Sequence, residues 1–377
     1  MKGLFFNTPG VNRKWLLQQL AVCRKVVRQS YYPITPYVKV VQRKDRLLLE
    51  ATSGDVFYSV IGDSGNEQVR REVGVLVSPD RLYQIVSKIR KDYVGVELTA
   101  DGKCRIDGAI ELCSEGSSED FPTFPTEEGL EVIGEGVLNL RELVAMRMRE
   151  LEDGYGQVWE GGAFFNLPRG EVAQTDGRRL YVIKIRGLGG KESFLLPSGA
   201  LEVFSMVGVK SQDVKSVRLG KRLVTFILSE AVLGVRKHEC DYPDYVAIVG
   251  GFKEHLDEKG SILTIRRKGD FEGVLQEALS VFGTGYAPSG IFHLQKCVRL
   301  EAGGLYSKEF DFDHFYVGNV GNTTEVRLNL LYLHDAIKCF PESGRLNVAF
   351  IGPLDVCRVT CEQKPGYQAY IMPMRKD

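Results

Sequence analysis

Apolar residues recur at helical spacing in the first part of the chain. Segment 13–28 has them at i, i+4, i+7 and i+11, which places them on one face of a helix. A second helix is predicted to begin at Ser78 and Pro79, because serine is a good N-cap and proline fits the first helical position. Strand-like runs follow, with a hairpin turn predicted at 100–103. The apolar faces of the two helices consist of Leu16, Leu20, Cys23 and Val27, and of Leu82, Ile85, Val86 and Ile89.

The same order of elements recurs twice in the rest of the chain. Helices are predicted at 140–151 and 198–208, and again at 271–282 and 329–340. The strand-like runs after them include 217–219, 223–228, 232–236, 346–351, 356–360 and 370–374. Any α+β protein alternates helices and strands. Here, however, corresponding helices start at similar offsets in three units of about 125 residues, a usual domain size.

The repeat predicts an α+β fold with three domains, at 1–127, 128–250 and 251–377. The first boundary follows the proline-containing stretch 121–125, and the second lies near 249–252, at a Gly-Gly pair. The length of 377 residues agrees with two or three domains.

Composition narrows the class of protein. With 44% hydrophobic and 26% charged residues, the chain has the composition of a globular protein. The sequence shows no secretion signal and no membrane span, and its eight cysteines are scattered, so we expect a cytoplasmic protein with free thiols and no membrane partner. Lys plus Arg equals Asp plus Glu at 49 each, which argues against a protein that grips nucleic acid by bulk attraction.

Local basic faces remain possible in a neutral chain. The polar side of helix 13–28 is almost entirely positive, and so is that of the helix starting at Pro79. A charge run is usually a solvated helix face. Because two helices of one domain carry such stripes, we interpret them as a DNA-facing surface that touches phosphates without reading sequence. The candidate DNA-binding residues are Lys14, Arg24, Lys25, Arg28, Arg81, Lys88, Lys91 and, in the second unit, Arg147. Helix 271–282 carries Glu272 and Glu277 on its polar side and is assigned no DNA contact.

Four short motifs carry a resemblance to a known family. They are Glu119-Asp120-Phe121-Pro122, the run Gln174 to Leu180 (QTDGRRL), Tyr242-Pro243-Asp244-Tyr245 and Tyr370-Ile371-Met372-Pro373-Met374-Arg375. In this order, and inside three repeats of this size, they resemble the bacterial DNA polymerase III beta subunit, the sliding clamp, with the present chain as a divergent member. The part of the third unit before residue 325 matches only in its pattern of elements.

The resemblance implies a non-enzymatic ring subunit that encircles duplex DNA and tethers the replicative polymerase. Each subunit would have three clamp domains, and a head-to-tail homodimer would close a six-domain ring with helices lining the hole and sheets outside. A clamp loader is implied as a further partner. Neither a cofactor nor a metal is expected.

The resemblance also implies an apolar cleft for short partner peptides between the second and third domains. The matching positions are Thr175, Gly177, Arg178, Arg179, Leu180, Pro243, Ile248, Tyr370, Ile371, Met372, Pro373, Met374 and Arg375. Apolar side chains would form an adaptable floor, with arginine as a donor at the rim. The chain has Arg178 where the family often has histidine, and Val246-Ala247 where a basic pair is common. These departures leave the peptide preference open.

The remaining motifs in the sequence give little support for a catalytic site. The run 187–193 is glycine-rich but lacks the spacing of a phosphate-binding loop, so a turn between strands is expected. Cys357 and Cys361 are interpreted as buried packing residues, since no second cysteine pair has a zinc-site spacing. Asp311, Asp313 and His314 form a small acidic cluster, which keeps a metal-dependent DNA-processing enzyme as one alternative. A clamp-fold scaffold for repair or recombination proteins is the other.

Overall fold

The structure is a computed structural model, and its chain divides into two compact units. Unit 1 comprises 1–144, 187–189 and 196–237, and unit 2 comprises 145–186, 190–195 and 238–377. The structure describes residues 10–28, 33, 35–43, 45–64, 72–125, 127, 129–138, 148, 157, 159–207, 214–282, 288–294, 298–310, 313–316 and 325–375.

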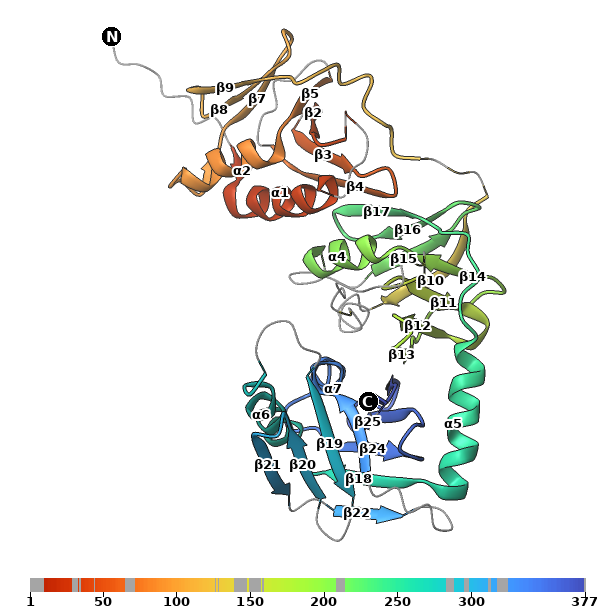
Figure 1. The fold of residues 1–377 in the computed structure, drawn as a ribbon. Helices are drawn as coiled ribbons and strands as arrows, with labels where there is room; N and C mark the ends of the chain where they lie inside the picture. The colour runs from red at the N-terminus through yellow and green to blue at the C-terminus, as the bar shows by residue number, and fades with distance from the viewer. Residues whose placement is uncertain are drawn as a thin grey trace. The chain divides into compact units, whose positions relative to one another are not determined.

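Unit 1 contains a large antiparallel sheet (Figure 1). Its eight strands, in spatial order, are β10 (Glu131–Leu138), β15 (Val214–Leu219), β16 (Leu223–Ile227), β17 (Ala231–Arg236), β4 (Val56–Asp63), β3 (Arg46–Thr52), β2 (Val38–Arg43) and β5 (Val73–Val77). The pairing of β17 with β4 joins strands far apart in the sequence, with Leu233 opposite Tyr58. Two smaller sheets pair β1 (Val11–Asn12) with β6 (Tyr93–Val94), and β7 (Val96–Thr99) with β8 (Lys103–Ile106) and β9 (Ile110–Cys113).

Three described helices of unit 1 pack beside one another: α1 (Arg13–Val27), α2 (Pro79–Lys88) and α4 (Ser198–Val207). The predicted apolar face of α1 is buried throughout, which confirms that helix. Ser78 caps α2 through its hydroxyl, with Pro79 in the first turn, as predicted. The helix layer sits close to the sheet, because a Cβ atom at Gly62 would lie only 2.4 Å from the ring of Trp15.

Unit 2 contains a second large sheet. Its nine strands, in order, are β14 (Ser193–Leu196), β11 (Ala163–Asn166), β12 (Glu171–Thr175), β13 (Arg179–Lys184), β26 (Tyr367–Ile371), β25 (Cys357–Cys361), β24 (Leu346–Phe350), β18 (Ser261–Ile265) and β22 (Asp313–Tyr316). A short 3-10 turn, η1 (Leu167–Arg169), joins β11 to β12. The pairing of β13 with β26 places Leu180 opposite Tyr370.

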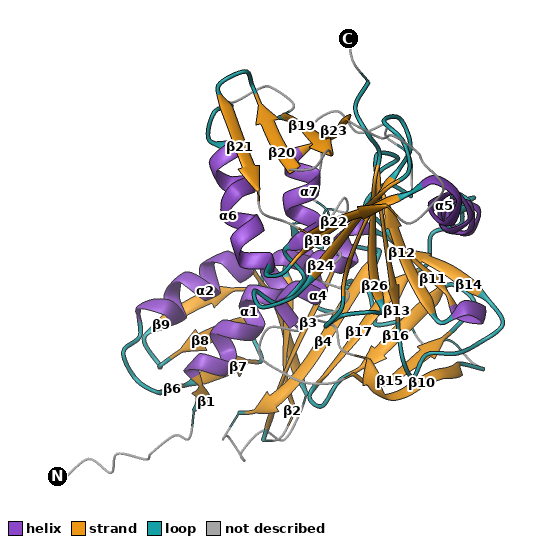
Figure 2. Ribbon diagram, turned by 90° about the horizontal axis from the view of Figure 1, so that it is seen from below, coloured by secondary structure: helices purple, strands orange, loops and turns teal. Residues whose placement is uncertain are grey.

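The remaining elements of unit 2 are a four-stranded sheet and three described helices. The sheet, in order, is β21 (Tyr306–Phe310), β20 (Val298–Ala302), β19 (Ser289–Leu294) and β23 (Glu325–Asn329). Burial alternates along β19 and β20, so one face is apolar and the other is open. The helices are α6 (Lys268–Leu279) and α7 (Leu330–Ile337), which pack together, and α5 (Tyr245–Lys259), which runs along one side of unit 2 (Figures 1 and 2).

Most predicted elements agree with the structure. The turn at 100–103 joins β7 to β8, and helices 198–208, 271–282 and 329–340 correspond to α4, α6 and α7. The last predicted strand, 370–374, instead forms as Tyr367–Ile371, because Pro373 has no N–H to continue the ladder. Apart from Met148, the predicted helix at 140–151 lies outside the described residues.

The three-domain division stays a prediction. The two compact units follow the two large sheets, and the segment 128–250 contributes strands to both of them. The Gly250-Gly251 pair, expected near a domain boundary, lies inside α5.

Candidate functional site

The candidate DNA-binding residues of unit 1 lie on α1, on α2 and just after α2. Five of the seven that the structure describes face an acidic side chain. Arg24 pairs with Asp80 and stacks over the ring of Tyr83 at 4.5 Å, and Arg28 lies 4.0 Å from the same carboxylate. The remaining three pairs are Lys25 with Glu202, Arg81 with Glu115 at 3.3 Å, and Lys91 with Asp107 at 3.1 Å.

The charge of these helices is therefore more mixed than the sequence pattern indicates. Arg28, Arg81 and Lys91 are exposed, and exposed ion pairs contribute only about 0–1 kcal/mol, so a phosphate can compete for these three cations. Arg24 and Lys25 are half-buried. Lys14 and Lys88 are exposed and have no acidic partner among the described residues. Arg147 lies outside the described residues.

A hollow of about 460 Å³ lies beside Lys14, where α1 meets α2 and α4. Its other polar contributors include Gln18 and Ser205, and its wall also contains Tyr83 and Met206. The sequence did not indicate Ser205 and Met206 of α4. The periodicity of a helix shows which face is apolar but not which other helix packs against it.

The candidate peptide cleft lies wholly within unit 2. Its first part is the turn between β12 and β13. The hydroxyl of Thr175 donates to the carbonyl of Arg179 at 2.7 Å, and Gly177 has a φ of 80°, a conformation that glycine adopts without strain. Asp176 accepts hydrogen bonds from the backbone N–H groups of Arg178 and Arg179 at 3.0 and 2.9 Å. These bonds fix the shape of the turn.

Arg179 lies inside the unit rather than at an accessible rim. Its side chain has no solvent exposure, and its Nε and Nη1 donate to Asp176 at 2.7 Å and to Asp335 at 3.2 Å. Its guanidinium also stacks on Tyr332 at 4.6 Å. Arg178 is half-buried, and its Nη1 reaches the hydroxyl of Tyr332 at 3.5 Å.

The C-terminal segment lies against this turn. The N–H of Met372 donates to the carbonyl of Arg178 at 2.9 Å. Leu180, Tyr370 and Ile371 are buried, whereas Met372 and Arg375 are exposed and Pro373 and Met374 are half-buried.

The third part of the candidate cleft is the start of α5. Tyr245 packs in one apolar cluster with Leu180 and Tyr370, and burial raises the pKa of the Tyr245 phenol, which donates to Glu171 at 3.0 Å. Pro243 is half-buried, and Ile248 is 44% exposed at the surface. The structure thus brings the three sequence-distant segments into one region. The part open to a ligand is Gly177, Arg178, Pro243, Ile248 and Met372 to Arg375.

The cysteines and acidic residues give no metal centre in the described part of the chain, where no cluster of three or more ligating side chains occurs. Cys357 and Cys361 are buried on β25, as predicted, and burial raises the pKa of both thiols. The run 187–193 lies between β13 and β14, which confirms a connection between strands. Of the acidic cluster, Asp311 lies outside the described residues. No described helix is long and apolar enough to cross a membrane.

Neither a protein-family model nor a curated protein matches the sequence. Solved structures match over nearly the whole chain. The DNA polymerase sliding clamp from Bacillus subtilis is 15% identical and superposes with a TM-score of 0.80, covering 97% of this chain and 98% of that one. The putative DNA polymerase III beta subunit from Eubacterium rectale is 16% identical, with a TM-score of 0.79, 97% of this chain covered and 99% of that one. The pol III beta protein of Caulobacter crescentus is 20% identical, with a TM-score of 0.76 and coverage of 97% and 98%.

The chain has the fold of the bacterial sliding clamps. The predicted α+β clamp fold is confirmed, and so is the resemblance drawn from the four motifs. At these identities most side chains differ between this chain and the solved clamps, although the fold is the same. The individual binding residues therefore have to be tested in this chain itself.

Proposed function

We propose that the chain is a DNA sliding clamp, a non-catalytic subunit that encircles duplex DNA and tethers a replicative polymerase in the cytoplasm. The observation that carries the proposal is the sliding-clamp fold over 97% of the chain. A second observation supports it, because the cations of α1 and α2 include exposed lysines that meet no acidic side chain in the described part of the chain.

The proposed mechanism is topological. Each subunit would contribute its three predicted domains, so that a head-to-tail dimer closes a ring of six clamp domains. Lys14, Lys88 and the weakly paired arginines would touch phosphates without reading bases, so the ring can move along the duplex. Salt screens such contacts but does not open a closed ring. A polymerase held at the candidate cleft then stays at high effective concentration near the primer end.

The test uses linear duplex DNA with cohesive ends, which a ring can thread without a loader. The protein is mixed with the DNA, the ends are ligated, and the circles are separated from free protein by gel filtration in high salt. A clamp is expected to co-elute with the circles as a dimer by light scattering, and to leave when a restriction enzyme cuts them. Protein that leaves ligated circles in high salt, or that stays on cut DNA, contradicts the proposal.

The same experiment tests the lysines. Here the protein and the DNA are mixed and ligated at low salt, before the separation in high salt. The double variant Lys14→Glu with Lys88→Glu is expected to lower the fraction of protein trapped on circles severalfold, because both new carboxylates repel the phosphates. The matched control is Lys215→Glu with Lys221→Glu, which alters exposed lysines of β15 and the turn after it. The control should load like the unaltered protein, and both variants should remain dimers. Equal loading of the two variants would mean that Lys14 and Lys88, on α1 and α2, do not contact DNA.

A further inference from the structure

A pocket of about 410 Å³ on the open side of the four-stranded sheet shares Met374 and Arg375 with the candidate cleft and extends beyond it. Its apolar wall consists of Ile291, Pro353, Leu354 and Met374. Leu354 is 64% exposed and adds apolar surface at this wall. Its charged residues are Glu325, Arg327 and Arg375.

The two arginines of this pocket have no acidic partner in the part of the chain that the structure describes. Neither Arg327 nor Arg375 forms an ion pair among the described residues, and the Nε atom of Arg327 is buried without a hydrogen-bond acceptor. The neighbouring Arg299, on β20, also has a buried Nε without a hydrogen-bond acceptor, but it differs from Arg327 in forming an ion pair, with Glu301 at 3.1 Å. A buried donor without an acceptor is unfavourable, so Arg327 is set up for an acceptor that the described part of the chain does not supply.

The one carboxylate of the pocket is engaged elsewhere. Glu325 faces His293, with Oε1 3.4 Å from Nδ1 of the imidazole. The pocket therefore contains two guanidinium groups against one carboxylate, and its excess charge is positive. Arginine binds carboxylates in a planar, two-bond geometry that lysine cannot provide.

The C-terminal segment connects this pocket to the candidate cleft. The N–H of Met372 bonds to Arg178 in the cleft turn, and the N–H of Met374 bonds to the carbonyl of Arg327 at 2.8 Å. Met372 thus contacts the turn of the cleft, and Met374 and Arg375 line the pocket. An extended peptide that crosses the segment would reach both, because successive residues span about 3.3 Å each.

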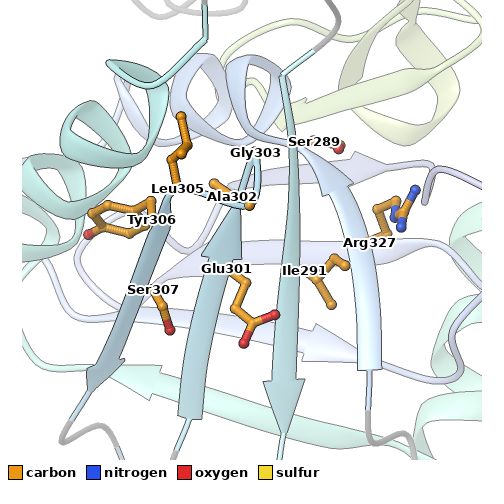
Figure 3. Close-up of a pocket in the computed structure, with 10 residues that line it drawn as sticks. Ser289, Ile291, Glu301, Ala302, Gly303, Leu305, Tyr306, Ser307 and Arg327 are labelled. Carbon is orange, nitrogen blue, oxygen red and sulfur yellow. The ribbon is translucent and has the colours of Figure 1, made fainter.

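The pocket continues over the sheet but lies away from its β21 edge. A second hollow, of about 520 Å³, shares Ile291 and Arg327 with it (Figure 3). Strand β23, which carries Arg327, is the edge opposite β21. Pairing of β21 with a second subunit would therefore leave the arginine pocket open.

We propose that this pocket binds a carboxylate-bearing residue, Asp or Glu, of the same partner peptide that occupies the cleft, with an adjacent apolar side chain against Leu354 and Ile291. The inference rests on the proposed function, because it extends the peptide site of the clamp. It makes Arg327 a specificity-determining residue: partners with an acidic residue at the correct spacing bind more tightly than partners without one.

The test uses phage-displayed random dodecapeptides selected on the intact protein. Selected peptides are synthesised in two forms, one with each Asp and Glu kept and one with the amide in its place. The acidic form is expected to bind about tenfold more tightly, as measured by fluorescence anisotropy. In Arg327→Gln that difference should vanish, while the amide form binds both proteins equally, which shows that the variant remains folded. The control Arg299→Gln, on the same sheet, should keep the tenfold preference.

The outcomes separate the inference from the proposed function. Ile248→Asp alters an exposed residue of the cleft and should abolish binding of every selected peptide. If Ile248→Asp abolishes binding but Arg327→Gln leaves the acidic preference intact, the arginine pocket is not the carboxylate site and the cleft stands. If Ile248→Asp leaves binding intact, or if no peptide is selected, the cleft itself is wrong and the inference falls with it.

Discussion

The guanidinium of Arg179 carries a positive charge into the interior of unit 2. A charge without solvent is stable only when it is paired and hydrogen-bonded, and here Asp176 and Asp335 provide the pairing. Asp335 belongs to α7, so the ion triad joins that helix to the turn of the candidate cleft. Burial raises the pKa of the Tyr370 phenol beside this region above its ordinary value. At the residue scale, the shape of the cleft therefore depends on an arginine that a ligand does not reach.

The variant Arg179→Ala is expected to lower the free energy of unfolding by about 3 kcal/mol, because it leaves two nearly buried carboxylates without their shared cation. Urea denaturation with linear extrapolation measures the change. The control Arg375→Ala removes an exposed arginine with no ion pair among the described residues, and should change stability by no more than about 0.5 kcal/mol. Equal, small losses in both variants would mean that the triad contributes nothing to folding.

At the scale of elements, α5 forms in spite of its sequence. Gly250 and Gly251 lie in its interior, and each glycine costs about 1 kcal/mol relative to alanine in a helix. The helix is held by Tyr245, Phe252 and Leu256, which lie at i, i+7 and i+11 and are buried in one apolar cluster with the large sheet. Burial of three large side chains outweighs the two glycines.

The glycine pair gives a direct test of α5. A Cβ atom at Gly250 meets no atom within 4 Å, so Gly250→Ala should stabilise the protein by about 0.5–1 kcal/mol, and Gly251→Ala should do the same. Gly250→Pro should cost about 3 kcal/mol or more, because proline breaks a helix interior. Thermal unfolding followed by circular dichroism measures all three variants. A proline that is tolerated at Gly250 would show that this segment is a linker and that α5 is not a helix there.

At the scale of the whole molecule, the middle of the chain is divided between two large sheets. Strands β15 to β17 extend the sheet of unit 1 through β4, and β11 to β13 extend the sheet of unit 2 through β26. Each pairing satisfies backbone groups that an open edge would expose. Among the described strands, β9 and β21 each keep one unpaired side in a small sheet. The proposed ring would use such edges for the joint between the first domain of one subunit and the third domain of the next.

Ile110 is 43% exposed on β9, so the proposed joint can be tested there. The variant Ile110→Asp is expected to convert the dimer to a monomer in light scattering at micromolar concentration, because it buries a charge in the subunit joint. Val132→Asp is the matched control, since Val132 is 48% exposed on β10, the edge of the large sheet of unit 1, and that variant should stay dimeric. A dimeric Ile110→Asp protein would place the joint elsewhere.

The sequence by itself determined the features that depend on neighbouring residues. The apolar period of α1 and the Ser78 cap of α2 follow from local geometry and appear as predicted. The order of the four motifs predicted the clamp fold, which the structure matches. Each motif is short, and its turn or strand is determined by residues that are adjacent in the sequence.

The tertiary structure alone decided which side chains meet across long stretches of chain. Helical spacing made the cations of α1 look unpaired, yet Lys25 meets Glu202 and Arg24 meets Asp80 once the helices pack. Arg179 looked like a rim donor until Asp335, 156 residues away, enclosed it. Arg327 had no local signal at all. Periodicity describes one element at a time, whereas the burial and pairing of charges depend on the neighbours that only packing brings together.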